Sequence, residues 1–369
     1  MDRRQFLKFA SGSVAALAIT GRFSAQASPA TLRQIAGPKN LLVGSALSWP
    51  KLQSPEAAAL IAAQCSIIVP ENELKWKFTQ PERDRYDFSK GDVMLAFAEA
   101  NGQRMRGHNL CWHEGNPEWL EALITPTNAA ALLRQHIMVV AGHYRGKLHS
   151  WDVVNEAIDS RSGHPGGLRD SVWLKNLGDG YLDLAFRAAE EADPGALLTY
   201  NDFGIENDLP EENAKREAVL GLLRGMRSRN VPIHALGIQG HLLAHNDGPR
   251  FHYLHGFLKD LEKMNIQVFI TELDVDDREL GGDVSKRDQR VAEIYRDFLK
   301  TALQYNNVRA VLTWGLTDRD VWINTFHPRT DGLPKRPLPF DAKLQPKAAF
   351  QAMCEVMQEA PTRSAAPTS

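Results

Sequence analysis

Two glutamates in this sequence each close a short apolar segment, and together they could perform acid–base and nucleophilic chemistry. Glu156 ends residues 151–156 (WDVVNE), and Glu272 lies in residues 269–274 (FITELD). Two carboxyl groups on either side of a glycosidic bond are the minimum set for hydrolysing it, because one protonates the leaving oxygen and the other stabilises the cationic sugar centre. A single glutamate at such a place is more often a structural ion-pair partner. A pair, with Asn155 directly before one member, is far more specific.

Short β-branched or apolar runs recur along the chain, and each is followed by a segment with helical periodicity. This alternation predicts a parallel sheet covered by helices. Eight such strands predict an α/β fold, a single (β/α)8 TIM barrel, with its polar site at the carboxyl ends of the strands. Both glutamates fall at that end. The predicted strands are residues 41–48, 66–71, 103–111, 150–155, 197–203, 235–241, 268–274 and 310–316.

The segments between the strands carry helix start and stop signals. Ser54-Pro55-Glu56 offers an N-cap, a proline at the first helical position and an early acid. A doubly wound open sheet is the alternative, but no Gly-x-Gly-x-x-Gly follows the first strand, and the polar residues are spread over nearly every strand end. The predicted helices are residues 54–64, 90–100, 128–143, 181–192, 211–228, 250–264, 286–304 and 347–359.

Composition limits the classes of partner. The 369 residues include 43 basic and 45 acidic side chains without a long like-charged block, so we expect no nucleic-acid partner. Three widely separated cysteines, Cys65, Cys111 and Cys354, allow at most one disulfide and have no metal-ligand spacing. We interpret all three as packing residues and expect neither a metal nor a cofactor.

The two ends of the chain are predicted to lie outside the catalytic domain. Arg3-Arg4 precedes an uncharged small-residue stretch, and residues 25–27 (AQA) fit a signal peptidase site. Residues 1–27 are therefore predicted to be a twin-arginine-type signal peptide, which implies export to the periplasm or the medium. Residues 28–359 would be the catalytic domain, with no membrane segment in the mature form, and residues 360–369 a flexible tail.

Residues 151–157 and 270–274 resemble the acid/base and nucleophile signatures of glycoside hydrolase family ten, the β-1,4-xylanases. Further motifs resemble the same family in the same order over nearly the whole mature chain. Long, ordered motifs of this kind are much more specific than any single short pattern. They are residues 71–76 (ENELKW), 107–113 (GHNLCWH), 200–202 (YND), 239–241 (QGH) and 314–315 (WG).

The resemblance implies a retaining endo-1,4-β-xylanase in which Glu156 is the acid/base and Glu272 the nucleophile. It also implies that Gln239 contacts Glu156, that His241 hydrogen-bonds Glu272, and that Asp274 orients His241. Asn155 would bind the sugar 2-hydroxyl, a contact that typically strengthens in the transition state. The substrate-binding residues implied by the resemblance are Glu71, Asn72, Lys75, His108, Trp112, Trp314 and Trp322.

The sequence departs from the family pattern near the third strand. Gly115 stands three residues after Trp112, where the family usually carries Gln, so one sugar contact is expected to be absent or replaced. Asn109, Cys111 and Val321 also differ from the commoner residues. We expect these changes to affect affinity and subsite preference before they affect the chemistry.

Three other readings stay open. A metal-dependent barrel hydrolase is disfavoured because His108, His113, His241 and His245 form no His-x-His or His-Glu-x-x-His pattern. A non-catalytic carbohydrate-binding barrel is disfavoured because both glutamates are present. A β-1,4-glucanase of the same fold would differ mainly in accepting the hydroxymethyl group that glucose carries. We expect xylan or xylo-oligosaccharides as substrate and a monomeric enzyme.

Overall fold

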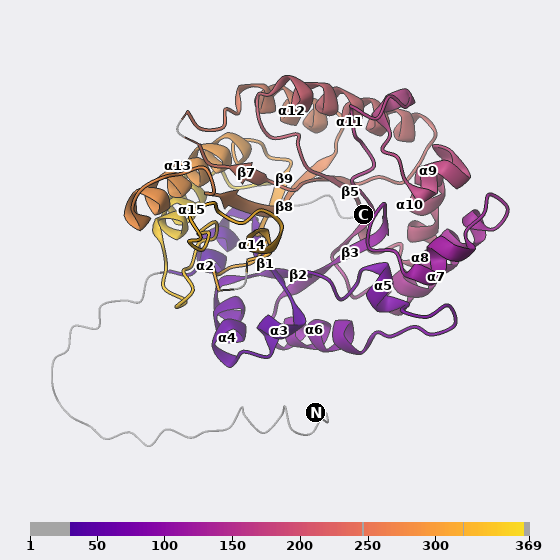
Figure 1. Cartoon of the computed structure of the whole chain (residues 1–369), viewed down its shortest axis with the longest axis horizontal. Helices are drawn as coiled ribbons and strands as arrows, with labels where there is room; N and C mark the ends of the chain where they lie inside the picture. Colours follow the sequence, from indigo (N-terminus) through magenta and orange to yellow (C-terminus); the bar gives the residue numbers. More distant parts are fainter. Residues whose placement is uncertain (1–29, 246, 320, 365–369) are drawn as a thin grey trace, which may run out of the picture. The chain divides into compact units, whose positions relative to one another are not determined.

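The predicted runs form the strands of a closed parallel barrel (Figure 1). The computed structural model describes residues 30–364 except positions 246 and 320. Hydrogen bonds join the strands in the order β6-β5-β4-β3-β2-β1-β9-β8, and β6 pairs with β8 to close the ring. The prediction of a single (β/α)8 barrel is confirmed. The strands are β1 (Leu42–Leu47), β2 (Ile67–Pro70), β3 (Arg104–Trp112), β4 (Ser150–Asn155), β5 (Leu197–Asp202), β6 (Ala235–Ile238), β8 (Gln267–Asp276) and β9 (Val308–Thr313).

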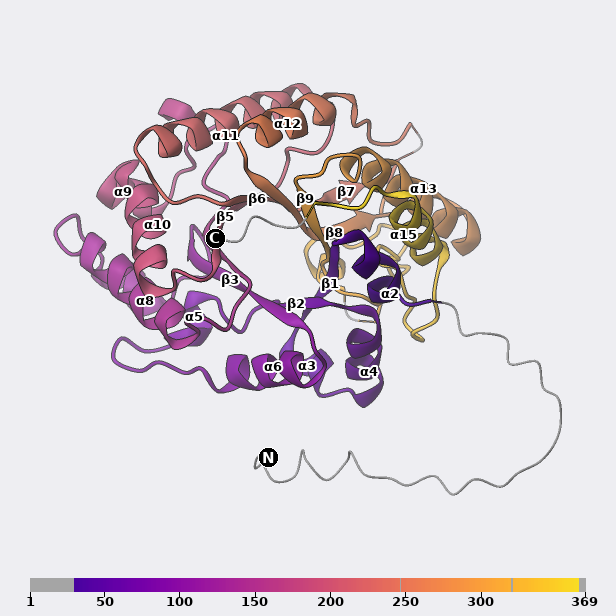
Figure 2. The ribbon, with the colours of Figure 1, turned by 180° about the vertical axis from the view of Figure 1, so that it is seen from behind.

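Helices surround the ring, as Figure 2 shows from behind. Each of the eight predicted helical segments is present, with bounds within two residues of those expected, and Ser54 caps α4 by accepting the N–H of Ala57. The long helices are amphipathic, so one stripe of each is buried against the strands. They are α4 (Pro55–Gln64), α6 (Ser89–Ala100), α8 (Ala129–His143), α10 (Gly180–Ala192), α11 (Pro210–Ser228), α12 (His252–Lys263), α13 (Val284–Ala302) and α15 (Ala348–Glu359).

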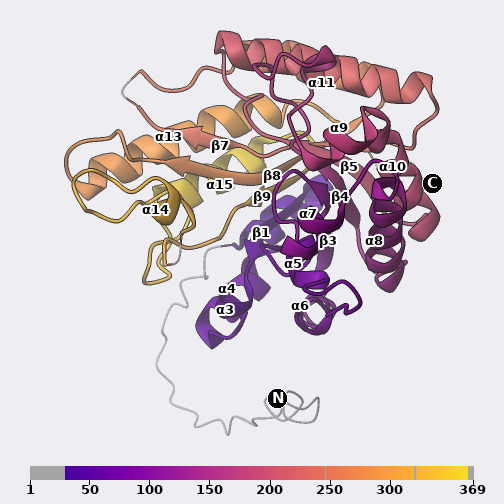
Figure 3. The same cartoon turned by 45° about the vertical axis from the view of Figure 1, so that its right-hand side comes forward.

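Several short helices were not predicted, and most of them lie in the connections that follow strands (Figure 3). Segments of four to six residues carry too little periodicity to be recognised in a sequence. They shape the barrel mouth because loops after the strands build that end. They are α3 (Trp49–Leu52), α5 (Trp76–Thr79), α7 (Glu118–Leu123), α9 (Val172–Leu177) and α14 (Ile323–Phe326), with the 3-10 turns η2 (Gly37–Lys39) and η3 (Pro165–Gly167), while α2 (Leu32–Ala36) precedes β1.

A small apolar cluster fills the inside of the ring. It includes Val69 of β2 and, from the neighbouring strands β6 and β8 across the ring, Ala235 and Phe269. Trp314, directly after β9, belongs to the same cluster and is 7% exposed. The interior is therefore a packed core, and the polar site is confined to the mouth above it.

The sixth strand differs from its predicted extent, residues 235–241. Strand β6 ends at Ile238, and a separate short strand, β7 (His241–Leu243), pairs with the end of β8. Gly240 interrupts the run with φ +79°, a backbone conformation that a residue with a side chain rarely adopts. Because of this turn, Gln239 directly follows β6, whereas His241 is the first residue of β7.

The first half of the predicted tail, residues 360–364, contacts the barrel through Arg363. Arg363 is 1% exposed, and its side chain donates to the carbonyl oxygens of Val308 (3.0 Å) and Leu303 (3.1 Å). Its backbone N–H donates to the carbonyl of Lys39, and its carbonyl accepts from Asn40 Nδ2. A buried guanidinium needs such partners, and only the folded barrel assembles them. Residues 365–369 lie outside the described residues.

Cys65, Cys111 and Cys354 are buried free thiols. Burial raises the pKa of the Cys65 thiol to about 12 and also raises that of Cys111, so both thiols stay protonated and inert near neutral pH. Among residues 30–364, leaving out the two undescribed positions, no helix is long and apolar enough to cross a bilayer. The predicted signal peptide, residues 1–27, lies outside the described residues.

Candidate active site

Two asparagines connect the carboxylates of Glu156 and Glu272. Asn155 Nδ2 donates to Glu156 Oε1 at 3.0 Å, and Asn201 Nδ2 donates at 2.8 Å both to Asn155 Oδ1 and to Glu272 Oε1. Asn155 and Asn201 are register partners at the ends of β4 and β5. Glu272 belongs to β8, on the other side of β6. The carboxylates therefore share one mouth of the barrel and are joined by a chain of two amides.

Gln239 contacts both halves of this arrangement. Its Nε2 donates to Glu156 Oε1 at 2.9 Å, so the contact expected from the sequence is present. Its backbone carbonyl accepts the N–H of Glu272 at 2.8 Å. Because one residue holds one carboxylate by its side chain and the other by its backbone, a shift of Gln239 would move the two glutamates relative to each other.

The backbone at Glu156 is unusual for a residue with a side chain. Its φ is +58°, which turns the chain sharply where β4 ends. Two bonds hold this turn: the N–H of Glu156 donates to the carbonyl of Asn201 at 2.8 Å, and Arg169 Nε donates to the carbonyl of Glu156 at 2.8 Å. The surrounding structure therefore fixes the direction of the Glu156 side chain.

Trp112 contacts Glu156 directly. Its indole Nε1 donates to Glu156 Oε2 at 2.9 Å, and His113 Nδ1 lies 3.9 Å from the same oxygen. Burial and the nearby charge of Arg169 lower the pKa of His113 to about 4, so this imidazole is neutral at ordinary pH. The sequence assigned Trp112 only to substrate binding. In the structure it also orients the carboxylate, because Glu156 Oε1 takes the Gln239 and Asn155 amides while Oε2 takes the indole.

Glu272 is held by a line of polar groups that ends at Asp274. His241 Nε2 lies 3.3 Å from Glu272 Oε2, and His241 Nδ1 lies 2.9 Å from Asp274 Oδ1, so both expected contacts are present. Burial opposes a charge on His241, but the carboxylate and hydrogen bond of Asp274, followed by those of Glu272, raise the pKa of His241 well above its ordinary value. His241 is therefore a cation between two anions.

The same line sets the protonation state of Glu272. Burial by itself would raise its pKa, since the side chain is only 5% exposed, but the hydrogen bond from His241, the charges of His108 and His241 and the Asn201 amide bring it down to about 2. Glu272 is thus ionised at neutral pH. An ionised carboxylate with one oxygen on an amide and the other on an imidazolium suits a nucleophile.

Two tryptophans border this line. Trp322, half-buried at the start of α14, donates its Nε1 to Asp274 Oδ2 at 2.8 Å, and its ring lies 5.0 Å from that of His241. Trp314 packs edge-on to both His108 and His241, with ring centroids 5.2 and 6.5 Å away. Both tryptophans therefore reach the site, although Trp314 is mostly buried and Trp322 is the more accessible.

The residues expected to grip sugar at the second strand lie together. Lys75 Nζ donates to Asn72 Oδ1 at 3.0 Å and stands 5.2 Å from the centre of the Trp112 ring. Glu71 pairs with Lys51 at 3.0 Å. Burial lowers the pKa of Lys75, although the charge of Glu272 opposes this change. Amide, carboxylate and ammonium groups beside an indole ring form a polar edge with an aromatic face, which suits a sugar.

His108 is less accessible than its predicted sugar contact suggests. It is 2% exposed, and its Nδ1 lies 2.8 Å from Asp152 Oδ2. Asp152 is in turn ion-paired with Arg106, and both are buried. His108 is therefore anchored at Nδ1 by a buried ion pair, while its Nε2 lies 3.4 Å from Asn109 Nδ2.

Sequence reasoning gave no role to Asn201, Asp152 or Glu206. Asn201 was noticed only as part of the YND motif, yet it joins Asn155 to Glu272. Glu206 is buried and accepts the backbone N–H of Gly240 at 2.8 Å. The available signal was weak: Asp152 lies within β4, Asn201 near the end of β5 and Glu206 in the loop that follows β5, and a buried polar group at any of these places would be costly without a partner.

Gly115, the departure from the family pattern, lies against Trp112. Its φ is +69°, and a Cβ placed there would lie 3.1 Å from Trp112 Cε3. Its carbonyl accepts the N–H of Lys77 at 2.9 Å. Glycine here lets the loop pass close to the indole ring, and it leaves the position without any side chain that could reach a sugar.

These features, a (β/α)8 barrel with two joined carboxylates at its carboxyl mouth, define a glycoside hydrolase. The sequence profile described as "Glycosyl hydrolase family 10" matches residues 31–356. The chain belongs to this family.

Several curated relatives and solved structures are similar over most of their length. "Endo-1,4-beta-xylanase B" of Thermotoga neapolitana is 34% identical over 335 residues, which cover 89% of this chain and 92% of the relative. Native xylanase 10B from Thermotoga maritima superimposes with a TM-score of 0.80 at 32% identity, covering 89% of this chain and 98% of that one. Xylanase 10B from Thermotoga petrophila RKU-1, solved in complex with xylobiose, gives a TM-score of 0.80 at 32% identity, with 89% and 97% coverage.

Proposed function

We propose that this chain is a retaining endo-1,4-β-xylanase in which Glu156 is the acid/base and Glu272 the nucleophile. The observation that carries the proposal is the asymmetry between the two joined carboxylates. Glu272 is kept ionised by His241 and Asn201, whereas Glu156 receives neutral donors, the indole of Trp112 and the amides of Gln239 and Asn155. One carboxylate is thus suited to attack and the other to proton transfer.

In the first step, a carboxylate oxygen of Glu272 forms a bond to the anomeric carbon while the bond to the leaving oxygen breaks. Glu156 gives its proton to that oxygen, so the leaving sugar departs neutral. In the second step, the Glu156 carboxylate takes a proton from water, and the water oxygen attacks the anomeric carbon as the ester bond to Glu272 breaks. Two inversions give retained configuration, and both glutamates return to their starting states.

Xylan is proposed as the substrate because of the relatives and the site walls. Relatives from Thermotoga neapolitana and Dictyoglomus thermophilum carry xylanase names, and a similar structure contains xylobiose. Trp322, tied to Asp274, is expected to crowd the hydroxymethyl group of a glucose unit. A relative from Acetivibrio thermocellus is called "Exoglucanase XynX"; it is 31% identical, and the matched region covers 86% of this chain but only 29% of that protein. A glucanase is therefore the second candidate.

Rescue by azide tests the two catalytic roles. In Glu272→Ala, azide should enter on the face vacated by the carboxylate and give an α-glycosyl azide, after a loss of at least about 10⁴-fold in kcat. In Glu156→Ala, azide should attack the glycosyl-enzyme instead of water and give the β-glycosyl azide. Surface variant Glu99→Ala is the control and should form no azide product. The reverse pair of anomers would contradict the assignment.

Initial rates on xylan and on a soluble cellulose derivative test the substrate. A rate on xylan at least tenfold higher is expected, with mixed internal products from the start. Equal rates would favour the glucanase, and binding without turnover on either polymer would favour a carbohydrate-binding barrel. NMR of the first product released should show the β-anomer. Initial release of the α-anomer would rule out the retaining mechanism.

We further propose that residues 1–27 direct export and that the mature enzyme begins at Ser28. The support is the order of the paired arginines, the small uncharged stretch and the AQA sequence. Expression of the full chain in a bacterium should put activity outside the cytoplasm, with Ser28 at the mature N-terminus. The double change Arg3→Lys and Arg4→Lys should keep the chain inside. Equal export of both forms would contradict a twin-arginine signal.

A further inference from the structure

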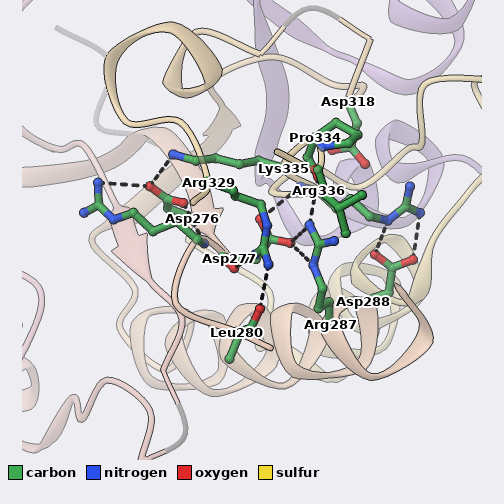
Figure 4. A network of polar contacts seen from close by, with 12 residues as sticks. Asp276, Asp277, Leu280, Arg287, Asp288, Asp318, Arg329, Pro334, Lys335 and Arg336 are labelled. Atoms are coloured by element: carbon green, nitrogen blue, oxygen red, sulfur yellow. Dashed lines mark hydrogen bonds and ion pairs between the residues drawn. The ribbon is translucent and has the colours of Figure 1, made fainter. Parts of the chain in front are cut away.

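A buried lysine lies behind the tryptophan wall of the site. Lys335 is 0% exposed, and its Nζ donates to Asp276 Oδ2 at 2.9 Å (Figure 4). The same Nζ donates to the carbonyl of Ile323 at 3.0 Å. Its backbone N–H donates to Asn324 Oδ1 at 3.1 Å. Ile323 and Asn324 are the first two residues of α14, and Asp276 is the last residue of β8. Lys335 therefore binds the start of α14 to the end of β8.

A second bond joins the same two elements, and it belongs to the active site. Trp322, the residue that precedes α14, donates its Nε1 to Asp274 Oδ2 at 2.8 Å. Asp274 and Asp276 are two residues apart on one strand, so their side chains point to the same side of β8. The position of α14 relative to β8 is thus fixed at two neighbouring carboxylates, one held by Trp322 and one by Lys335.

The segment that carries Lys335 is itself anchored by buried charges. Arg287 pairs with Asp277 at 2.6 Å and donates to the carbonyl of Pro334 at 2.8 Å. The Asp277 carboxylate also accepts the N–H of Arg336, whose guanidinium pairs with Asp288. Figure 4 shows these contacts converging between β8, α13 and the loop before α15. Lys335 consequently cannot drift with α14, because the residues on both sides of it are fixed to the barrel.

Buried ion pairs add little net stability compared with apolar side chains of the same volume, because desolvation offsets their attraction, whereas they do specify one geometry. We propose that Lys335 is a positioning residue of the active site: it fixes the start of α14, so that Trp322 stays on Asp274 and faces the substrate. The consequence for substrate binding rests on the proposed function. The fixed position of the Trp322 indole is independent of the proposed function, so the indole position and the effect on substrate binding can be tested separately.

Lys347 provides a matched control. It is also buried, and its Nζ donates to Asp318 Oδ2 at 2.8 Å and to the carbonyl of Arg336 at 2.7 Å. It therefore anchors the same loop but acts on Asp318, in the connection between β9 and α14, and its described side-chain contacts include no residue of α14. Lys335→Met and Lys347→Met remove the same charge from the same buried network, and a purely structural role predicts similar effects for both.

The first measurement is the indole N–H resonance of Trp322 in ¹⁵N-labelled protein, assigned by its loss in Trp322→Phe. Lys335→Met should shift or broaden this resonance and raise KM for xylo-oligosaccharides at least fivefold. Lys347→Met should lower the melting temperature but leave the Trp322 resonance and KM unchanged. If Lys335→Met does not fold, Asn324→Ala removes one contact of Lys335 to α14 and should give the same change in smaller degree. An unmoved resonance in the variant that folds would overturn the proposal.

The second measurement is a double-mutant cycle. In the Trp322→Phe background, Lys335→Met should reduce kcat/KM less than twofold further, because the indole that Lys335 positions is already gone. Independent, multiplying losses would show that Lys335 acts by another route and would overturn the proposal. If wild type does not cleave xylan, the proposed function fails, and the Trp322 resonance still decides the role of Lys335.

Discussion

The carboxylate of Glu206 accepts the backbone N–H of Gly240 at 2.8 Å, inside the turn that separates Gln239 from His241. Its other oxygen accepts the N–H of Ile205 at 2.7 Å. Gln239 holds Glu156 and His241 holds Glu272, so this buried carboxylate supports the turn between the two residues that contact the proposed catalytic pair. It carries out no chemistry itself, since backbone groups take up both of its oxygens.

Glu206 should make stability depend on pH. Burial and the neighbouring charge of Glu212 raise the pKa of Glu206 from 4.5 to about 7. The folded protein therefore holds this proton more tightly than the unfolded chain, so its contribution is complete below about pH 4.5 and is lost as pH rises through about 7. The loss is at most about 3 kcal/mol. Thermal unfolding at several pH values should show this decline in wild type and a smaller one in Glu206→Gln. Parallel curves would contradict it, and Glu99→Gln is the surface control.

Asp274→Asn should move the acid limb of the pH–rate profile. Without the Asp274 carboxylate, the pKa of His241 falls, and Glu272 loses the positive charge that helps hold its pKa near 2. Protonation of the nucleophile should then reduce kcat/KM at a pH at least about one unit higher than in wild type. The profile should be measured on a small aryl xyloside, with Asp260→Asn as an exposed control. An acid limb at the wild-type position would show that Asp274 does not act through His241.

Trp112→Phe should lower kcat/KM by about 2- to 10-fold, the value of an ordinary intramolecular hydrogen bond. The ring remains, but the bond from Nε1 to Glu156 Oε2 is lost. Trp119→Phe is the control because it also loses an indole bond, in that case to the carbonyl of Gln80 at 3.0 Å. Equal losses in the two variants would mean that indole removal acts only through general stability.

Gly115→Ala should reduce both stability and activity. The φ of +69° costs a residue with a side chain about 1 kcal/mol, and the new methyl group would press on Trp112 at 3.1 Å. Gly146→Ala separates the two effects, since Gly146 has φ +72° and nothing within 4 Å of the added Cβ. Both variants should lose similar stability by chemical denaturation, but only Gly115→Ala should lower kcat/KM. Equal activities would mean that Trp112 gives way without moving Glu156.

The barrel was predictable because its signals are local and repeated. Each strand is a short apolar run. Ser54-Pro55 marks the start of a helix regardless of where that helix packs in the fold. The turn at Gly240 was missed because residues 239–241 (QGH) directly follow the apolar run of β6, so the predicted strand included them. Only the pairing of His241 with β8 shows that a new strand begins there. Local pattern thus predicted where elements are but not how one strand divides.

Some of the contacts around the two glutamates were predictable from sequence motifs, and others were not. Gln239 and His241 were placed by motif, and their side chains do meet Glu156 and Glu272. The indole bond of Trp112 and the anchoring of Lys335 could not be read from the sequence, because each joins residues far apart in the chain. Burial of a charged side chain is decided by its partners, and a sequence does not identify them.

Arg363 links the last described residues to both sides of the seam between β1 and β9. Its backbone meets Lys39 and Asn40 just before β1, and its side chain meets Val308 at the start of β9. These contacts can therefore form only after Arg363 itself has been synthesised and has left the ribosome. A chain that ended at residue 359 would contain every strand and both glutamates but would lack the Arg363 contacts that join β1 to β9. We expect proteolysis to start at this seam in such a chain.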